Sequence, residues 1–367
     1  MADTQPIALG ANHDEGARDM FVLGLKRHIN LGLGPGLKTV YEKRARPGFE
    51  KTAGREFKNR HEVRKHMQKD DFFQVWGSLW RTAQGLMWDA AEEKVSRQMP
   101  DLLARARSFK KKKGSVRTDA ALKVPGYVGD VDIHGQPGGY GYDEGGDDIT
   151  AGLLYESAGG IYGRGQGLSG EEKPAQAIIN FVQKTFPDLK VKRMLDEGCS
   201  SGGSEPIYCA AYPNAELHAI DVSAGMVRYA HAKMEAKGLA VHFSQQNAEK
   251  TDFPDNHFDL IVSNIMLHET SAKALPLIMK ECYRILKPGG VVCHLDVPLR
   301  NSQLDLYTQW YRDWSTHFNN EPFWGSLHDM DVKSKIVAGG FKPENAFDTM
   351  APNSSGTGVW WVCGGRK

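Results

Sequence analysis

The feature that most constrains the fold is an alternation of short apolar strands and amphipathic helices from Pro174 to the end of the chain. Strands that alternate with helices predict an α/β fold with a mainly parallel sheet, because parallel neighbours need a long crossover that a helix supplies. The expected strands are residues 192–198, 215–221, 240–246, 258–264, 291–298, 341–350 and 356–365. The last two are suited to a closing antiparallel hairpin, so we expect a sheet of seven strands.

Residues 1–109 are expected to form a helical domain. Segments 21–33 and 72–95 carry apolar residues at helical spacing, and polar stretches such as 44–62 are expected to separate the helices. The second segment has an apolar stripe formed by Phe72, Val75, Trp76, Leu79, Trp80, Leu86 and Met87. A stripe with tryptophans is more typical of packing between helices or subunits than of a cofactor site. The helices at 71–95 are therefore a candidate homodimer interface.

Residues 110–170 are rich in glycine and tyrosine. Fifteen of the forty glycines lie between Gly126 and Gly170, interleaved with five tyrosines. Glycine at this density favours turns over regular structure, so we expect a long loop or short hairpins. Long loops in compact proteins often cover functional sites, and the tyrosines favour an active-site cover over a plain linker.

Composition argues against several kinds of partner. A net charge of +1 lacks the basic excess of a nucleic-acid or membrane-binding surface, and no apolar run is long enough to span a bilayer. The first residues lack the basic and apolar pattern of a secretory signal. The cysteines are odd in number and form no C-x-x-C motif, as is typical of reduced core thiols. We therefore expect a cytoplasmic protein that acts on a small molecule.

The strongest functional motif is the glycine-rich loop Leu195–Gly203 (LDEGCSSGG), which follows the first expected strand and precedes a helix. Glycine lets the backbone approach a ligand closely, and the helix N-terminus presents free N–H groups to a carboxylate or phosphate. Asp221 ends the next strand, where a carboxylate can accept hydrogen bonds from both hydroxyls of a ribose. Together the loop and Asp221 indicate a cofactor that contains a nucleoside.

A nicotinamide-dependent dehydrogenase is one alternative. Its loop requires G-x-G-x-x-G, whereas Gly198, Ser200 and Gly203 give G-x-S-x-x-G, which is one glycine short. The pairs Tyr229–Lys233 and Tyr283–Lys287 match the Y-x-x-x-K pattern of short-chain dehydrogenases. The first pair lies too early in that topology, and a proline–glycine helix stop accounts for the second.

The motifs resemble, in order and spacing, those of class I methyltransferases that depend on S-adenosyl-L-methionine (SAM), closest to the ubiquinone/menaquinone-biosynthesis type. The matching segments are LDEGCSSGG, Asp221 in AIDVSAGMV, Asn247-Ala248-Glu249, FPDNHFDLIVSNIMLHE and RILKPGG. The resemblance covers roughly Pro174 to Val297 and implies a Rossmann-like methyltransferase sheet for residues 171–367. It does not cover the helices of residues 1–109.

The resemblance also implies the cofactor contacts. The implied SAM-binding residues are Asp196, Gly198, Ser200, Gly202, Asp221, Met226, Asn247, Ala248 and Asn264. The loop would pass beneath the methionine part with Asp196 near its amino group, Asp221 would hold the ribose, and the later residues would surround the adenine or line the floor. Asn247 stands where the family usually has aspartate, and Ser200 replaces a common glycine.

Candidate catalytic residues follow from the chemistry. Methyl transfer from a sulfonium is an in-line displacement that needs proximity, and a base only where the acceptor carries a proton. His268 and Glu269 are one candidate pair, the alternative being packing over the adenine and capping of a helix. His328 and Asp329 are the second, the alternative being a helix N-terminus capped by Asp329 with His328 exposed. Expected substrate contacts are Tyr155, Tyr162, Asp296, Tyr311 and Trp324.

No metal site is expected. His61, Glu62 and His66 resemble a zinc-binding helix motif, but histidines five residues apart point about 140° apart on a helix. The expected function is SAM-dependent methyl transfer to a phenol or hydroxyl oxygen of a small aromatic or apolar metabolite. Transfer to carbon, nitrogen or sulfur, methylation of a macromolecule, and SAM binding without methylation are the alternatives.

Overall fold

The structure, a computed structural model, describes residue 7 and residues 9–109, 113–165, 173–297 and 304–367. The expected domain boundaries near residues 110 and 170 lie outside the described residues. The strands are β1 (Ser115–Arg117), β2 (Arg193–Glu197), β3 (Glu216–Asp221), β4 (His242–Gln245), β5 (Phe258–Asn264), β6 (Leu286–Asp296), β7 (Ala346–Pro352) and β8 (Val359–Arg366). The helices of the first half are α1 (His13–Arg27), α2 (Gly34–Val40), α3 (Arg46–Ala53), α4 (Arg60–Met67), α5 (Asp71–Arg107), α6 (Gly126–Gly129) and α7 (Thr150–Gly165).

The second half contributes the helices that surround the sheet. These are α8 (Pro174–Thr185), α9 (Glu205–Ala211), α10 (Ala224–Lys237), α11 (Ala274–Ile285), α12 (Leu306–Arg312), α13 (Trp314–Phe318), α14 (Trp324–Asp329) and α15 (Val332–Ala338). Short π- or 3₁₀-helical turns are η1 (His28–Leu33), η2 (Tyr41–Ala45), η3 (Ile133–Gly135) and η4 (Leu267–Glu269). Asp313 separates α12 from α13, since α12 ends before it and α13 begins after it.

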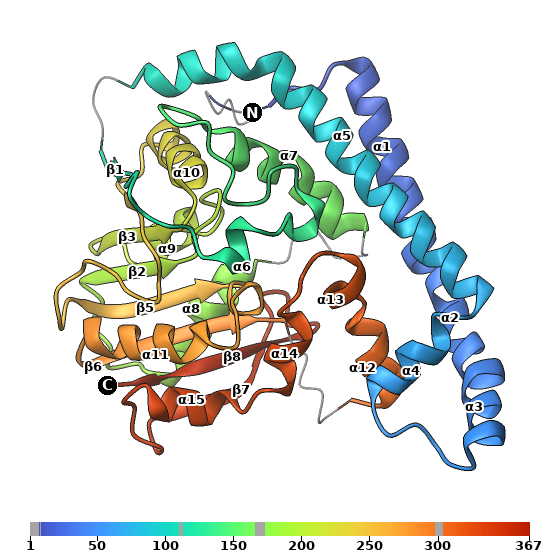
Figure 1. The fold of residues 1–367 in the computed structure, drawn as a ribbon. Coiled ribbons are helices and arrows are strands. Elements are labelled where there is room, and N and C mark those ends of the chain that lie inside the picture. The colour runs from blue at the N-terminus through green and yellow to red at the C-terminus, as the bar shows by residue number, and fades with distance from the viewer. Residues whose placement is uncertain (1–6, 8, 110–112, 166–172, 298–303) are drawn as a thin grey trace.

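The sheet confirms the predicted α/β class. Its strand order is β1-β4-β3-β2-β5-β6-β8-β7, and only β8 runs antiparallel to its neighbours (Figure 1). It has eight strands rather than seven, because Ser115–Arg117 adds an edge strand parallel to β4. Three residues are too few to show an alternating pattern in the sequence. The chain order reverses between β2 and β5, and such a switch point places a crevice at the carboxyl ends of the strands.

Helices cover both faces of the sheet. Side chains of α8, α9 and α10 pack on one face, and those of α11 and α15 pack on the other. Consecutive residues of β2 illustrate the alternation, since Met194 belongs to the first core and Leu195 to the second. This three-layer arrangement holds the strand ends, and the loops that follow them, in fixed positions.

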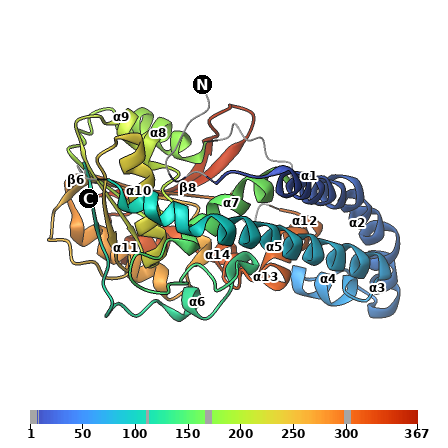
Figure 2. The same ribbon diagram turned by 90° about the horizontal axis from the view of Figure 1, so that it is seen from above.

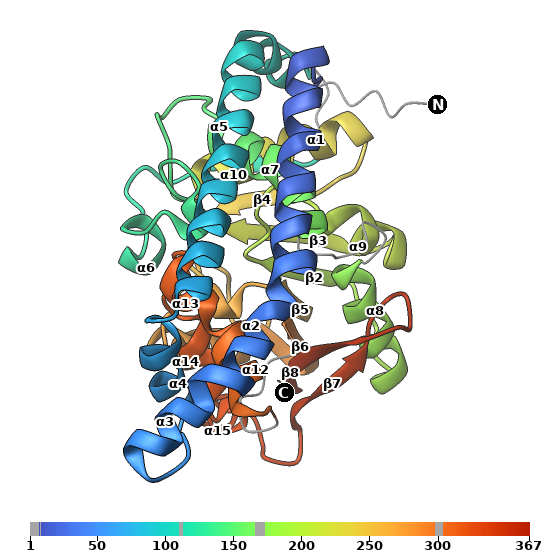
Figure 3. The same ribbon diagram turned by 90° about the vertical axis from the view of Figure 1, so that its right-hand side faces the viewer.

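The N-terminal helices form an arm beside the α/β part. Figures 1 and 3 show α1 and α5 side by side, and Figure 2 shows α2, α3 and α4 extending away from the sheet. The helical expectation for this region is confirmed, but the predicted polar linker at 44–62 is wrong because it contains α3 and the start of α4. The missed signals are a proline in the first turn of α3 and Gly54, which ends it with φ +67°.

The two tryptophans of the stripe pack within one chain, whereas its Val75, Leu79 and Leu86 are exposed. The ring centroid of Trp314 in α13 lies 5.5 Å from that of Trp76 and 4.0 Å from that of Trp80. The segment between β6 and β7 therefore shares a core with the arm, and these rings are buried without a second subunit. A homodimer stays a prediction. Among the described helices, none combines the length and the apolar run that crossing a bilayer requires.

The glycine/tyrosine-rich region contains more regular structure than expected. Residues Thr150–Gly165 form α7, a helix of 16 residues, so the expectation of only loops or hairpins is wrong there. A Cβ atom on Gly152 would lie 2.4 Å from the Cβ of Tyr229 on α10. Gly152 therefore allows α7 and α10 to approach closely and does not form a turn. A high density of glycines in a sequence does not distinguish these two uses of glycine.

Candidate functional site

A cavity opens at the carboxyl ends of the central strands, where ligands of open α/β sheets usually bind. Seven of the nine residues implied as SAM contacts line it: Gly198, Ser200, Asp221, Met226, Asn247, Ala248 and Asn264. Asp196 lines an adjoining hollow, which shares Gly198, Ser200 and Asn264 with the cavity. Gly202 lines neither and instead supports the loop from behind, against α10.

The glycine loop is held to the end of β3 by Asp221. The backbone N–H of Ser200 donates to Asp221 Oδ2 at 3.0 Å, and that of Ser223 donates to Oδ1 at 2.9 Å. Gly198, Ser200 and Gly202 have φ of +70°, +50° and +74°, so the loop adopts a left-handed conformation at three positions. Each oxygen of Asp221 retains a lone pair that can accept a ligand hydroxyl.

Alanine at Gly202 is expected to be harmful, whereas alanine at Gly203 is not. A Cβ on Gly202 would lie 2.9 Å from the Cβ of Ala230, at a positive φ, whereas a Cβ on Gly203 has nothing within 4 Å. We expect Gly202→Ala to lower the free energy of unfolding by about 1–3 kcal/mol and Gly203→Ala to change it by less than about 0.5 kcal/mol. Urea denaturation of both variants measures this, and equal effects would contradict the strained-loop geometry.

Two residues that line the adjoining hollow have a buried oxygen without a hydrogen-bond partner, Oδ1 of Asp196 and Oδ1 of Asn264. Burial, with the neighbouring charge of Glu205, raises the pKa of Asp196 well above its usual range, and burial raises the pKa of Glu205 to about 7. A cationic ligand group placed here would satisfy these oxygens and restore the charged form of the carboxylates.

The opposite end of the cavity is apolar and closed by α6. Met226 and Ala248 line it, and Asn247 Oδ1 accepts the backbone N–H of Glu249 at 2.9 Å. The carbonyl of Asn247 is therefore already used once in a turn. Tyr127 from α6 donates its hydroxyl to Glu249 Oε1 at 2.6 Å. Burial raises the pKa of Tyr127, so the hydroxyl stays neutral and remains a donor.

His268 and Glu269 lie on η4, directly after β5, and both line the cavity. The Nδ1 atom of His268 lies 2.7 Å from Asp296 Oδ1, and the backbone N–H groups of His268 and Val297 also donate to this carboxylate. The Nε2 atom of His268 lies 3.4 Å from Glu269 Oε1. Glu269 faces this ring and does not cap a helix, so that alternative is wrong.

His134, on η3 in the glycine/tyrosine-rich region, completes the polar side of the cavity. Its Nε2 lies 3.3 Å from Glu269 Oε1, and its Nδ1 lies 3.1 Å from Glu321 Oε1 and 2.8 Å from the amide nitrogen of Asn319. The backbone of His134 forms a tight turn with a positive φ of +56°, and this turn sets the direction of the imidazole ring. No sequence pattern marked His134 or Glu321 as site residues.

The charges of this group are strongly coupled. Burial alone would lower the pKa of His268, but the carboxylates of Asp296 and Glu269 outweigh it and raise that pKa well above its usual range. Burial is likewise outweighed at His134, where Glu321 and Glu269 raise the pKa to about 9. In the free protein these two carboxylates therefore favour the protonated form of His268.

The second candidate pair is not at the cavity. Asp329 accepts two hydrogen bonds from the guanidinium of Arg60, at 2.8 and 2.6 Å, and it is the last residue of α14. His328 is buried, and its ring packs edge-on against Trp324 with centroids 5.4 Å apart. Neither lines the cavity, so both the catalytic interpretation and the alternative of an exposed His328 with Asp329 as an N-cap are wrong.

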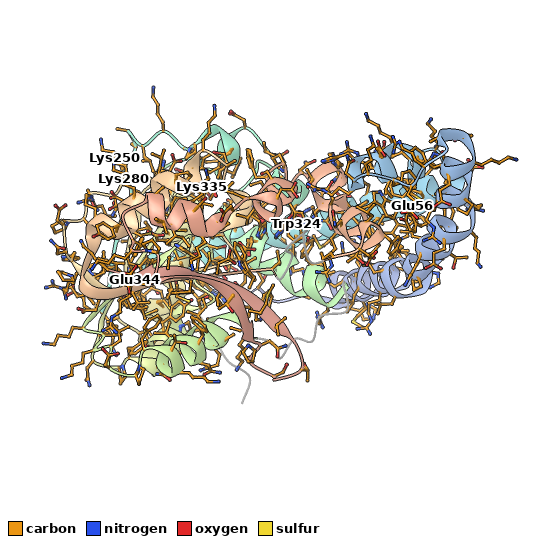
Figure 4. The ribbon with its side chains drawn as sticks, turned by 90° about the horizontal axis from the view of Figure 1, so that it is seen from below. Glu56, Lys250, Lys280, Trp324, Lys335 and Glu344 are labelled. Atoms are coloured by element: carbon orange, nitrogen blue, oxygen red, sulfur yellow. The ribbon has the colours of Figure 1, made fainter. Side chains whose placement is uncertain are left out.

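The expected substrate contacts separate into three groups. Tyr155 lines the cavity. Trp324 packs edge-on against His268 with centroids 4.9 Å apart, and Figure 4 shows it between the α/β part and the helical arm. Tyr162, Asp296 and Tyr311 do not line the cavity: Tyr162 accepts a hydrogen bond from Asn319, Asp296 orients His268, and Tyr311 stacks on Tyr307 within α12. Tyr127, Tyr140, Gln246 and Met266 line the cavity and were not predicted.

Comparison with known proteins identifies part of the chain. Residues 194–290, from β2 into β6, match the family model of a methyltransferase domain. The chain is 32% identical to the ubiquinone/menaquinone biosynthesis C-methyltransferase of Pseudomonas paraeruginosa, over 33% of this chain and 46% of the relative. It is 35% identical to the malonyl-[acyl-carrier protein] O-methyltransferase of Methylococcus capsulatus, over 27% of this chain and 34% of the relative.

A third relative, phosphoethanolamine N-methyltransferase 3 of Arabidopsis thaliana, is 29% identical over 39% of this chain and 27% of the relative. The chain spans half or less of the length of the first curated relatives it matches. The names of these three relatives specify transfer to carbon, oxygen and nitrogen, so the comparison leaves the acceptor atom open.

Proposed function

We propose that this chain, whose residues 194–290 form a methyltransferase domain, transfers a methyl group from SAM to an oxygen of a small aromatic or apolar acceptor. One observation carries the proposal. The cavity that contains the glycine loop and Asp221 continues into a second compartment, beyond the expected cofactor contacts, where Tyr140, Tyr155 and the polar group of His134, His268 and Glu269 line it. A protein that only bound SAM would need the first compartment and not the second.

The residues present fit SAM. Asp221 has free lone pairs for the ribose hydroxyls, and Met226 and Ala248 offer an apolar surface for the adenine. The unpartnered Oδ1 of Asp196, which lines the adjoining hollow, fits the ammonium of the methionine part. When bound, SAM supplies a methyl group on a sulfonium, and its transfer forms a bond to the acceptor oxygen as the carbon–sulfur bond breaks and its electron pair stays on sulfur.

The second compartment favours a small acceptor with a hydroxyl group. Tyr140 and Tyr155 come from the glycine/tyrosine-rich region, which we assign as the cover of the acceptor site. Burial raises the pKa of Tyr140 and Tyr155, so their rings stay neutral and suit an aromatic or apolar molecule. At the polar end, a hydroxyl finds hydrogen-bond donors and acceptors together, and Glu269 Oε2 is buried without a hydrogen-bond partner. When the acceptor oxygen is methylated, its hydroxyl proton transfers to Glu269 Oε2 along the hydrogen bond between them.

Isothermal titration with SAM and with its demethylated product, S-adenosylhomocysteine, tests the cofactor assignment. We expect both to bind in the micromolar range, because each fills the ribose and methionine sites. A screen of small phenols and alcohols with methyl-labelled SAM then tests the acceptor class. Binding of a nicotinamide dinucleotide in place of both compounds would contradict the cofactor assignment. Labelled product only from amines, thiols or carbon acids would contradict the assignment of an oxygen acceptor. A cytoplasmic location stays a prediction.

A further inference from the structure

Four side chains on the acceptor side of the cavity have the composition of a metal site. They are His134, His268, Glu269 and Glu321, and one potential ligand atom from each lies within 4.8 Å of all the others. We propose that these four side chains bind a divalent transition-metal ion. Two imidazoles with two carboxylates suit zinc, iron(II) or manganese(II) better than magnesium or calcium, which prefer oxygen ligands alone.

Three of the four histidine–carboxylate distances match the edges of a coordination shell better than hydrogen bonds; the fourth, 3.1 Å from His134 Nδ1 to Glu321 Oε1, has the length of a hydrogen bond. Glu269 Oε1 lies 3.3 Å from His134 Nε2 and 3.4 Å from His268 Nε2, and Glu321 Oε2 lies 3.8 Å from His268 Nε2. Ligand atoms about 2.1 Å from a tetrahedral ion are about 3.4 Å apart. Nitrogen–oxygen hydrogen bonds are most often about 2.9–3.0 Å long. The three separations therefore leave room for an ion between the atoms.

Each of the two carboxylates has one buried oxygen without a hydrogen-bond partner. Glu321 is 0% exposed, and its Oε2 atom, like Oε2 of Glu269, has no hydrogen-bond partner. The ion-pair partners given to both carboxylates by the described residues are the same two histidines. Buried carboxylates without partners are costly, and a cation at the centre of the group would offset that cost.

A surrounding layer of hydrogen bonds holds the ligands in position. Asp296 Oδ1 lies 2.7 Å from His268 Nδ1, so the Nε2 atom of the ring is directed into the cluster. The amide of Asn319 donates to Glu321 Oε1 at 2.6 Å, which leaves Oε2 toward His268. Histidines that bind metals characteristically donate their other ring N–H to a carboxylate or carbonyl.

The cluster differs from a second group of possible metal ligands because it is accessible from the cavity. His134, His268 and Glu269 line the cavity, so an ion bound there would keep an open side toward the acceptor. Glu197, Cys282 and His294 also lie close together, but all three are fully buried inside the α/β core and none lines the cavity. The second group therefore has no route for a ligand.

The consequence for the acceptor rests on the proposed function, whereas metal binding itself does not. A divalent ion beside the acceptor site would bind the hydroxyl oxygen and favour loss of its proton to Glu269 or to water. The oxygen electron pair would then form the bond to the methyl carbon. This favours acceptors whose hydroxyl group can bind a metal, such as phenols and enols.

Equilibrium dialysis against zinc, cobalt(II) and manganese(II), after removal of metals with a chelator, tests the site. We expect one equivalent of metal per chain, and for cobalt a visible absorption band. Glu321→Gln and His134→Ala should each weaken binding by at least about 100-fold, because loss of an outer partner alone typically costs 10–100-fold. His66→Ala is the matched control, since His66 lies on α4 in the arm and should leave metal binding unchanged.

The outcomes are decisive because folding is followed separately. Circular dichroism and SAM titration, which depends on Asp221, check that the variants are folded. Stoichiometric binding that is lost in both cluster variants and retained in His66→Ala supports the site. No bound metal in the wild-type protein, or equal binding in all variants, overturns it. Metal binding without SAM binding would instead contradict the proposed function and leave the metal site standing.

Discussion

Asp221→Ala is expected to weaken SAM binding at least about 100-fold. A hydrogen bond to a charged group contributes about 1.5–3 kcal/mol, and about 2.7 kcal/mol corresponds to a 100-fold change in Kd. Asp221 can accept two ribose hydroxyls, and it also accepts the N–H groups of Ser200 and Ser223. The substitution therefore removes ligand contacts and releases the glycine loop. Isothermal titration of wild type and variant measures the change.

Glu216→Ala is the matched control for this prediction, because Glu216 begins the same strand that Asp221 ends. Its carboxylate is half-exposed and lies 3.2 Å from Arg193, an ion pair of the surface type that contributes less than about 1 kcal/mol. We expect the Kd of Glu216→Ala for SAM to lie within about twofold of the wild-type value. A twofold change in Kd corresponds to less than the about 1 kcal/mol that such an ion pair can contribute. If Asp221→Ala bound SAM as tightly as Glu216→Ala, the ribose would lie elsewhere.

Trp80→Ala is expected to lower the free energy of unfolding by about 3–5 kcal/mol, as truncation of a buried tryptophan commonly does. Trp80 is 4% exposed, its ring packs 4.0 Å from that of Trp314, and its indole N–H donates to Asn30 at 2.9 Å. The ammonium of Lys26 lies 4.4 Å from the same ring. The variant would leave a cavity where the helical arm meets α13 and remove one partner each of Asn30 and Lys26.

Val75→Ala provides the control on the same helix, because Val75 is 59% exposed. We expect a change of less than about 0.5 kcal/mol there. Urea denaturation followed by far-ultraviolet circular dichroism compares both variants with wild type. A Trp80→Ala midpoint equal to that of Val75→Ala would contradict a shared core between the arm and the segment after β6.

The sequence was sufficient for features set by short, periodic patterns. The run from Arg193 to Asp221 shows an apolar strand, a glycine loop, a helix and a second strand, each recognisable from residues two to four positions apart. The parallel sheet and the approach of the loop to Asp221 follow from that local order, because right-handed crossovers permit few alternatives.

Local patterns were misleading where one residue type serves several purposes. Glycines in α7 looked like turn residues, although Gly152 serves the close contact with Tyr229. His328 and Asp329 are adjacent in sequence, but Asp329 pairs with Arg60 and His328 packs against Trp324. Neighbours on a short helix point in different directions, so adjacency in the chain does not place two side chains in one site.

By itself the sequence determined the sheet, the glycine loop and the acidic end of the second strand, because strand and helix periodicities are encoded within a few residues. Tertiary structure alone brought His134, His268 and Glu321 to one point and placed the arm against α13. These groups come from segments far apart in the chain, and their meeting depends on how buried surfaces pack. Packing of distant surfaces leaves no periodic trace in the local sequence.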